Sequence, residues 1–157
     1  MLKSIPPEIF KAYDIRGIVG RTLTPDIVER IGRAIGSEAR DRGRSAVAIG
    51  RDGRLSGPQL SAALAAGLQA SGIDVIDVGQ VATPMVYFAA HHLETHSCVM
   101  VTGSHNPPDY NGLKMVVAGE TLAGEAIQSL RRRIESGKLA SGAGSYRQAD
   151  VREDYLR

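Results

Sequence analysis

The sequence contains little cysteine, few aromatic residues and little net charge. Its 157 residues include one cysteine and no tryptophan, aromatic residues make up 4%, and 19 basic against 17 acidic side chains give a net charge of +2. A single cysteine, Cys98, cannot form an internal disulfide, and within the apolar run 97–101 we expect it to behave as a small buried hydrophobe. Because neither a basic stripe nor an aromatic stacking platform is present, nucleic acid is not an expected partner.

Long apolar segments are also absent. No stretch approaches the roughly 18 apolar residues of a membrane span, and the N-terminal sequence MLKSIPPEIF lacks the apolar centre of a signal peptide. We therefore expect a cytoplasmic protein with no membrane partner. A chain of this length with 43% apolar and 23% charged residues is typical of one compact domain.

Short runs rich in valine and isoleucine alternate with longer segments of helical period, which predicts an α/β domain. We predict strands over 46–50, 73–78, 97–102 and 113–118, and helices over 25–42, 58–71, 83–94 and 122–135. The link from 102 to 113 has no room for a crossover helix, so the last two strands should be antiparallel neighbours. The expected fold is a three-layer α/β/α sandwich with a mixed, mostly parallel sheet of about four strands.

The C-terminal residues resemble the start of another element. Asp150 and Glu153 have the spacing of a capping box, yet only residues 151–157 remain to form a helix, and so short a helix is marginal by itself. We interpret 1–157 as one domain of a longer protein, truncated near 150–157 at the start of the linker or helix that leads to a second domain. A natural frayed tail is the alternative.

The loop that follows the strand 97–102 is the candidate for chemistry. Ser104 comes directly after a strand of core character, which delivers its hydroxyl to the edge of the sheet where open α/β proteins bind ligands. Gly103 removes a Cβ that would block close approach of a ligand, and the prolines after Asn106 stiffen the loop. A rigid loop can hold a nucleophile in one geometry.

Lys114 lies ten residues beyond Ser104, with period-2 spacing that puts it on the opposite face from Leu113 and Met115. A serine that accepts and returns a phosphoryl group needs cations beside the transferring oxygens and a carrier for the proton. Lys114 and His105 can supply both. Serine, asparagine, proline and glycine are also the ordinary residues of tight turns, and a single strand lysine usually faces water, so the residues alone leave a purely structural loop open.

Three segments of the sequence resemble segments of one enzyme superfamily. The sequence TGSHNPPDYNGLK at 102–114 resembles the active-site loop of the α-D-phosphohexomutase superfamily. FKAYDIRGIVG at 10–20 resembles the N-terminal signature of its bacterial phosphomannomutase/phosphoglucomutase branch, and GRDGRLSG at 50–57 is similar to a third family segment. The three segments occur in family order, which identifies the chain as similar to the first, serine-bearing domain of these enzymes.

The resemblance implies roles for the loop. Ser104, as a phosphoserine, would give its phosphoryl group to glucose or mannose 1-phosphate or 6-phosphate, forming a bound 1,6-bisphosphate such as glucose 1,6-bisphosphate. Lys114 falls on the position of the general acid/base, with a solvent-facing strand lysine as the alternative. His105 would bind or polarise the reacting oxygens, with a loop-stabilising hydrogen bond as the alternative.

Further residues are implied to bind the substrate. Tyr13 and Arg16 match positions that reach the active cleft, where a phenol can bond a sugar hydroxyl and a guanidinium can pair with phosphate. A packed tyrosine and a surface ion pair are the alternatives. Asn106 is another substrate-binding candidate, unless it only shapes its own turn. Arg51, Asp52 and Arg54 should form an ion-pair network after the strand 46–50, with no direct catalytic part.

The resemblance also implies what must come from elsewhere. Family members hold Mg²⁺ with an aspartate-rich loop of their second domain and a phosphate oxygen on the serine; here only Ser104 can be a ligand, because no D-x-D-x-D cluster occurs. The partners are hexose phosphates and the remaining domains of the same polypeptide, so the isolated domain should fold without mutase activity. The products would feed nucleotide-sugar and polysaccharide synthesis. Two alternatives remain: phosphoglucosamine mutase, which usually has alanine at the position of Gly103, and a non-catalytic phosphate-binding or scaffold domain.

Overall fold

A computed structural model describes residues 5–156. In this range the sheet has seven strands in the order β1-β5-β4-β2-β3-β7, with β6 paired to β5. The strands are β1 (Ile15–Ile18), β2 (Ala46–Arg51), β3 (Asp74–Gln80), β4 (Cys98–Val101), β5 (Tyr110–Val117), β6 (Glu120–Thr121) and β7 (Tyr146–Gln148). The helices are η1 (Pro7–Ile9), α1 (Pro25–Asp41), α2 (Gly57–Ala70), α3 (Thr83–His92), α4 (Glu125–Ser136) and α5 (Arg152–Tyr155).

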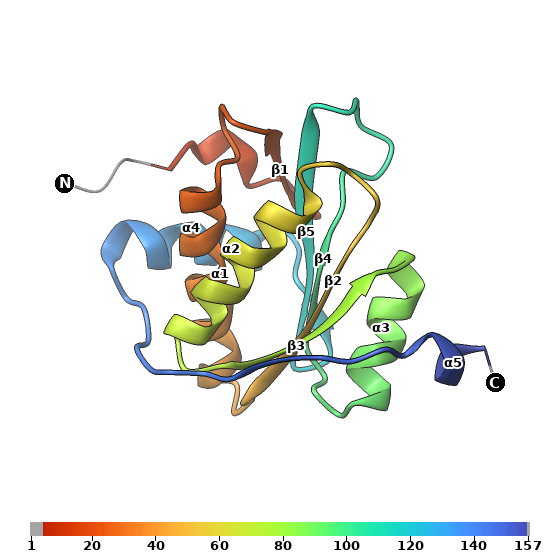
Figure 1. Ribbon diagram of the computed structural model, residues 1–157. Helices are drawn as coiled ribbons and strands as arrows, with labels where there is room; N and C mark the ends of the chain where they lie inside the picture. Colours follow the sequence, from red (N-terminus) through yellow and green to blue (C-terminus); the bar gives the residue numbers. More distant parts are fainter. Residues whose placement is uncertain (1–4, 157) are drawn as a thin grey trace.

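The predicted three-layer α/β/α sandwich is confirmed. Helices α1, α2 and α4 cover one face of the sheet, and α3 with the short α5 covers the other (Figure 1). Each face has its own apolar core: the larger includes Ile31, Leu64 and Leu113, and the smaller includes Val86 and Met100. Between residues 5 and 156, no helix has the length and apolar character needed to cross a bilayer.

The sheet is larger than predicted. Strands β2, β3 and β4 are parallel neighbours and β4 pairs antiparallel with β5, as the helix-containing and helix-free links required. Three short strands add to the expected four: β1 and β6 pair antiparallel with β5, and β7 pairs parallel with β3. The sheet therefore has seven strands rather than about four, and parallel and antiparallel pairings are equal in number.

Local signals set most helix boundaries. Thr24 caps α1, since its Oγ1 accepts a hydrogen bond from the Ile27 amide at 3.3 Å, and Gly137 ends α4 in the left-handed conformation with φ of 75°. Helix α4 begins at Glu125 rather than at Leu122 because the Leu122 amide donates to the Met115 carbonyl at 3.0 Å and extends the sheet pairing.

The expected capping box at the C-terminus does not form. Helix α5 begins at Arg152, and the Asp150 carboxylate accepts from the Arg152 amide at 3.0 Å instead of capping a longer helix with Glu153. This single turn packs against α3, where the Tyr155 ring meets the Phe88 ring edge-on at 5.4 Å. Docking to α3 explains why so short a helix forms.

Two glycines allow α1 and α2 to pack closely. A Cβ on Gly32 of α1 would lie 2.6 Å from the Leu64 carbonyl oxygen of α2. A Cβ on Gly67 of α2 would overlap the Glu29 carbonyl oxygen and lie 2.9 Å from the Arg33 amide nitrogen. Both obstructions are backbone atoms, which cannot move aside as a side chain can.

We expect Gly67→Ala to destabilise the domain by at least about 2 kcal/mol, because overpacking against backbone outweighs the gain of about 1 kcal/mol in helix propensity. Urea denaturation of the 157-residue chain measures the change. Gly57→Ala, at the start of the same helix, is the control: its Cβ would meet Arg51 Cδ at 3.4 Å, an ordinary contact. Equal stabilities of the two variants would show that the helices can separate at little cost.

Cys98 of β4 is buried with 1% of its surface exposed, and burial raises the pKa of its thiol from 9.0 to about 12. We expect the native thiol to resist maleimide at pH 8 and to react once the chain is unfolded. Because the folded pKa is raised, the stability contribution is complete below pH 9 and is lost as pH rises from 9 through 12. Comparing Cys98→Ala with the wild type over that range isolates this loss from other titrations. Parallel alkaline curves would contradict the assignment.

Candidate active site

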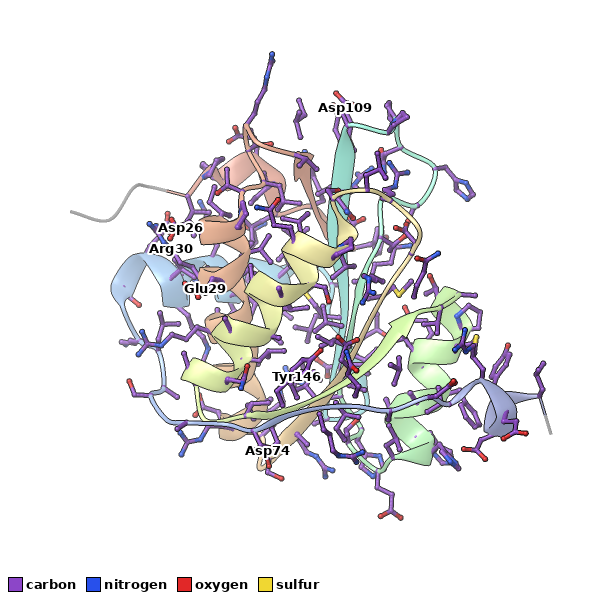
Figure 2. All side chains as sticks on the ribbon, in the orientation of Figure 1. Asp26, Glu29, Arg30, Asp74, Asp109 and Tyr146 are labelled. Atoms are coloured by element: carbon purple, nitrogen blue, oxygen red, sulfur yellow. The ribbon has the colours of Figure 1, made fainter. Side chains whose placement is uncertain are left out.

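The loop between β4 and β5 lies at one end of the sheet, beside the link 51–57 that joins β2 to α2 (Figure 1). Figure 2 shows Asp109 at that end of the molecule, where the loop enters β5. The Asp52 carboxylate in the link accepts hydrogen bonds from the Thr102 hydroxyl at 2.7 Å and from the Gly103 amide at 3.2 Å. The end of β4 is thereby fixed to the end of β2.

Ser104 has a constrained backbone and an exposed side chain. Its amide donates to the Thr102 hydroxyl oxygen at 3.0 Å, and its φ of 51° lies in the left-handed region that non-glycine residues rarely adopt. Residues in such conformations persist where their surroundings hold them, and they concentrate at functional sites. Its carbonyl accepts from Arg54 Nη2 at 3.1 Å, so the structure presents the Ser104 hydroxyl to solvent from a backbone that is held at both its amide and its carbonyl.

Asn106 links the loop to β1. Its side-chain amide and its backbone amide both donate to the Gly103 carbonyl, at 2.8 and 3.0 Å, so it does shape its own turn. Its Oδ1 accepts from Arg16 Nη1 at 3.2 Å. The other side of the Arg16 guanidinium pairs with Asp14 at 3.1 Å, which is the ion pair expected as the alternative. Arg16 reaches the loop because β1 pairs with β5 in the register Arg16↔Gly112.

All six predicted site residues line one cavity of about 410 Å³. Its lining consists of Lys11, Ala12, Tyr13, Asp14, Arg16, Ser104, His105, Asn106 and Lys114. The lining therefore contains three cationic side chains, Lys11, Arg16 and Lys114. It contains one carboxylate, that of Asp14, which is already paired with Arg16. An excess of positive charge around an exposed hydroxyl suits a phosphorylated ligand.

Exposure and hydrogen bonding of the site residues distinguish between some of the alternative interpretations given above. Tyr13 is 80% exposed, so it is not a packed tyrosine. The His105 ring is exposed and makes no hydrogen bond with residues 5–156, so the loop-stabilising alternative for it is wrong. Lys114 is half-buried between the buried Leu113 and Met115, as the period-2 pattern predicts, and lines the cavity with Ser104. The chemical roles of these side chains stay predictions.

The residues of the link 51–57 contribute more than expected. Arg51 forms a loose ion pair with Asp77 at 3.9 Å, away from the loop. The Arg54 guanidinium instead lies against Gly103, and a Cβ built on Gly103 would overlap its central carbon and Nε. The prediction that Gly103 gives room to a ligand is therefore wrong, because that space is filled by Arg54.

The metal that the resemblance implies is not accommodated by these residues alone. In the part of the chain that the structure describes, no three His, Cys, Asp or Glu side chains come together as a metal site requires.

Residues 7–141 match the family described as "Phosphoglucomutase/phosphomannomutase, alpha/beta/alpha domain I", and the chain belongs to this family. It is 60% identical over 154 residues to the phosphomannomutase/phosphoglucomutase of Pseudomonas aeruginosa. This match covers 98% of this chain and 33% of that protein. It is 53% identical to the phosphoglucomutase of Neisseria meningitidis serogroup B, covering 99% of this chain and 34% of that protein.

A solved structure has the same fold. A phosphoglucomutase/phosphomannomutase family protein from Burkholderia thailandensis superposes with a TM-score of 0.93 at 53% identity, over 97% of this chain and 35% of that chain. The chain thus spans about a third of the length of the relatives it matches.

Proposed function

We propose that this chain is the serine-bearing domain of a phosphohexomutase that interconverts the 1-phosphates and 6-phosphates of glucose and mannose. The observation that carries the proposal is the exposed Ser104 hydroxyl on a fixed loop in a cavity that also holds Lys114, Arg16 and His105. Its relatives named as mutases support the same reaction class.

The reaction moves one phosphoryl group in each direction. In the first step the bond between phosphorus and Ser104 Oγ breaks while a sugar hydroxyl forms the new bond to phosphorus and gives up its proton. Lys114 passes that proton to Ser104 Oγ, so that the serine leaves as a hydroxyl, and Arg16 and His105 offset charge on the transferring oxygens. In the second step Ser104 Oγ gives up its proton and forms the bond to the phosphorus at the other end of the 1,6-bisphosphate. The bond from that phosphorus to the sugar oxygen breaks, the sugar oxygen takes up the proton, and the isomerised sugar phosphate leaves.

We further propose that the longer protein supplies what this domain lacks. Mg²⁺ would be held by a phosphate oxygen on Ser104 together with oxygen ligands from a second domain, since Mg²⁺ requires near-octahedral oxygen coordination. The sugar and its distal phosphate would also contact other domains. On this proposal the isolated domain folds but has no mutase activity.

Gly103 favours this function over phosphoglucosamine mutase. The alanine usual in those enzymes would place a methyl group on the Arg54 guanidinium in this loop conformation. Assays of the full-length protein on glucose, mannose and glucosamine phosphates test the choice. Activity on glucosamine phosphates well above that on the other two would contradict it.

Mass spectrometry of the full-length protein purified from cells tests the chemistry itself. We expect a phosphoryl group on the peptide that contains Ser104, and we expect excess sugar phosphate to remove it. A non-catalytic scaffold domain would carry no phosphate that turns over. Phosphate absent from Ser104 throughout turnover would refute the proposed function.

A further inference from the structure

The Arg54 guanidinium is bound to four backbone carbonyls of the serine loop. Nη1 donates to the Pro107 carbonyl at 2.6 Å and to the Tyr110 carbonyl at 3.0 Å. Nη2 donates to the Asn106 carbonyl at 2.7 Å and to the Ser104 carbonyl at 3.1 Å. One side chain from the link between β2 and α2 thereby holds both limbs of a loop whose contacted residues are 50 to 56 positions away in the sequence.

The loop offers few backbone donors for these carbonyls, although the Pro107 carbonyl also accepts from the Tyr110 amide at 2.9 Å. Its two prolines lack amide hydrogens, and its Ser104 residue is held in the left-handed region. A planar guanidinium with five N–H groups in a fixed fork is pre-organised for several carbonyls at once, which the flexible ammonium of lysine is not. The Arg54 side chain is 16% exposed; its hydrogen bonds to the Asn106 and Tyr110 carbonyls are partly buried, and those to the Pro107 and Ser104 carbonyls are exposed.

The charge of Arg54 is locally compensated. Its Nε lies 3.7 Å from the Asp52 carboxylate, which also accepts the Arg54 backbone amide at 3.1 Å. Arg54 is absent from the lining of the cavity around Ser104. The cationic side chains that line the cavity are Lys11, Arg16 and Lys114, whereas Arg54 contacts the loop outside the cavity lining.

We propose that Arg54 is a positioning residue for the phosphoryl-transfer reaction: its four hydrogen bonds set the backbone geometry that aims Ser104 Oγ at the substrate. The inference rests on the proposed function. Since a displacement of about 1 Å at a reacting group can cost 10²-fold in rate, a looser loop lowers kcat far more than it weakens substrate binding.

The test is steady-state kinetics of the full-length protein with Arg54→Ala, Arg54→Lys and Arg51→Ala. We expect Arg54→Ala to lower kcat by about 10- to 100-fold with KM changed by about twofold or less, and Arg54→Lys to restore part of the loss. Arg51→Ala is the matched control, because it removes an arginine of the same link whose partner is Asp77, and it should keep kcat near wild type. An Arg54→Ala protein with wild-type kcat overturns the inference.

Gly103→Ala tests the hydrogen bonds of Arg54 independently, because its methyl group would displace the Arg54 guanidinium without removing it. We expect it to lower kcat in the wild-type background and to have little further effect beside Arg54→Ala, a non-additivity that a general loss of stability would not produce. If Arg54→Ala unfolds, Arg54→Lys and Gly103→Ala carry the test, and wild-type kcat in both contradicts the inference. A wild-type protein without mutase activity would instead refute the proposed function, so the two failures are distinguishable.

Discussion

Ser104→Ala is expected to lower the mutase turnover of the full-length protein by at least about 10³-fold, because it removes the atom that accepts and returns the phosphoryl group. On the proposed function the other parts of the site should still bind a sugar phosphate without Ser104, but none of them would carry phosphate between the two ends of the sugar. The effect should therefore fall on kcat rather than on KM.

The same substitution should leave the fold unchanged. The Ser104 hydroxyl is exposed and makes no hydrogen bond with residues 5–156, whereas the hydrogen bond to Thr102 uses the backbone amide that alanine retains. Coupled-assay progress curves with glucose 1-phosphate and mannose 1-phosphate measure turnover, and a thermal melt checks the fold. Ser145→Ala, at an exposed position before β7, is the control and should behave as wild type. An active Ser104→Ala protein would remove the nucleophile from the proposal.

Local patterns predicted the parts of the fold whose causes are local. Thr24 and Pro25 fix the start of α1 through hydrogen bonds and dihedral angles within four residues, so the sequence marks that start directly. The antiparallel pairing of β4 with β5 followed from the length of the link alone.

The sequence patterns did not predict strands β1 and β7, because these strands form by pairing with strands that are distant in the sequence. Strand β7 has the sequence YRQ, is exposed along its length and exists because residues 146–148 pair with Val75, Ile76 and Asp77 of β3. Strand β1 is four residues long and contains Gly17, so it lacks the valine- and isoleucine-rich run that signals a buried strand. Edge strands of this kind have no local pattern strong enough to predict.

The residues of the candidate site also divide into those that local motifs predicted and those whose contacts are distant in the sequence. The motif at 102–114 and the segment at 10–20 named the six residues, and the pairing of β1 with β5 brings them to one cavity. The function of Arg54 could not be predicted, because hydrogen bonds from a side chain to carbonyls of a distant loop leave no periodicity in either segment. Gly103 was misinterpreted for the same reason: its neighbour is 49 residues away in the sequence.

Lys114→Met in the full-length protein should slow turnover by about 10²- to 10⁴-fold, the range typical of a lost general acid/base. The alternation of side chains along β5 positions Lys114 for proton transfer. Its neighbours Leu113 and Met115 are buried in the core, whereas the Lys114 side chain lines the same cavity as Ser104. Methionine keeps the length and the apolar stem of lysine, so packing along β5 should be retained.

Lys114→Arg separates the two parts that lysine can play in this reaction. Arginine keeps a positive charge beside the transferring oxygens, but a guanidinium does not release its proton in proteins. If Lys114 carries the proton, Lys114→Arg should be nearly as slow as Lys114→Met, although both should still accept phosphate at Ser104 over long incubation with a 1,6-bisphosphate. Lys138→Met, at an exposed position after α4, controls for the loss of one positive charge. Recovery of most of the wild-type kcat in Lys114→Arg would mean that the residue acts through its charge, and the proton carrier would then have to be sought in His105, which lines the same cavity.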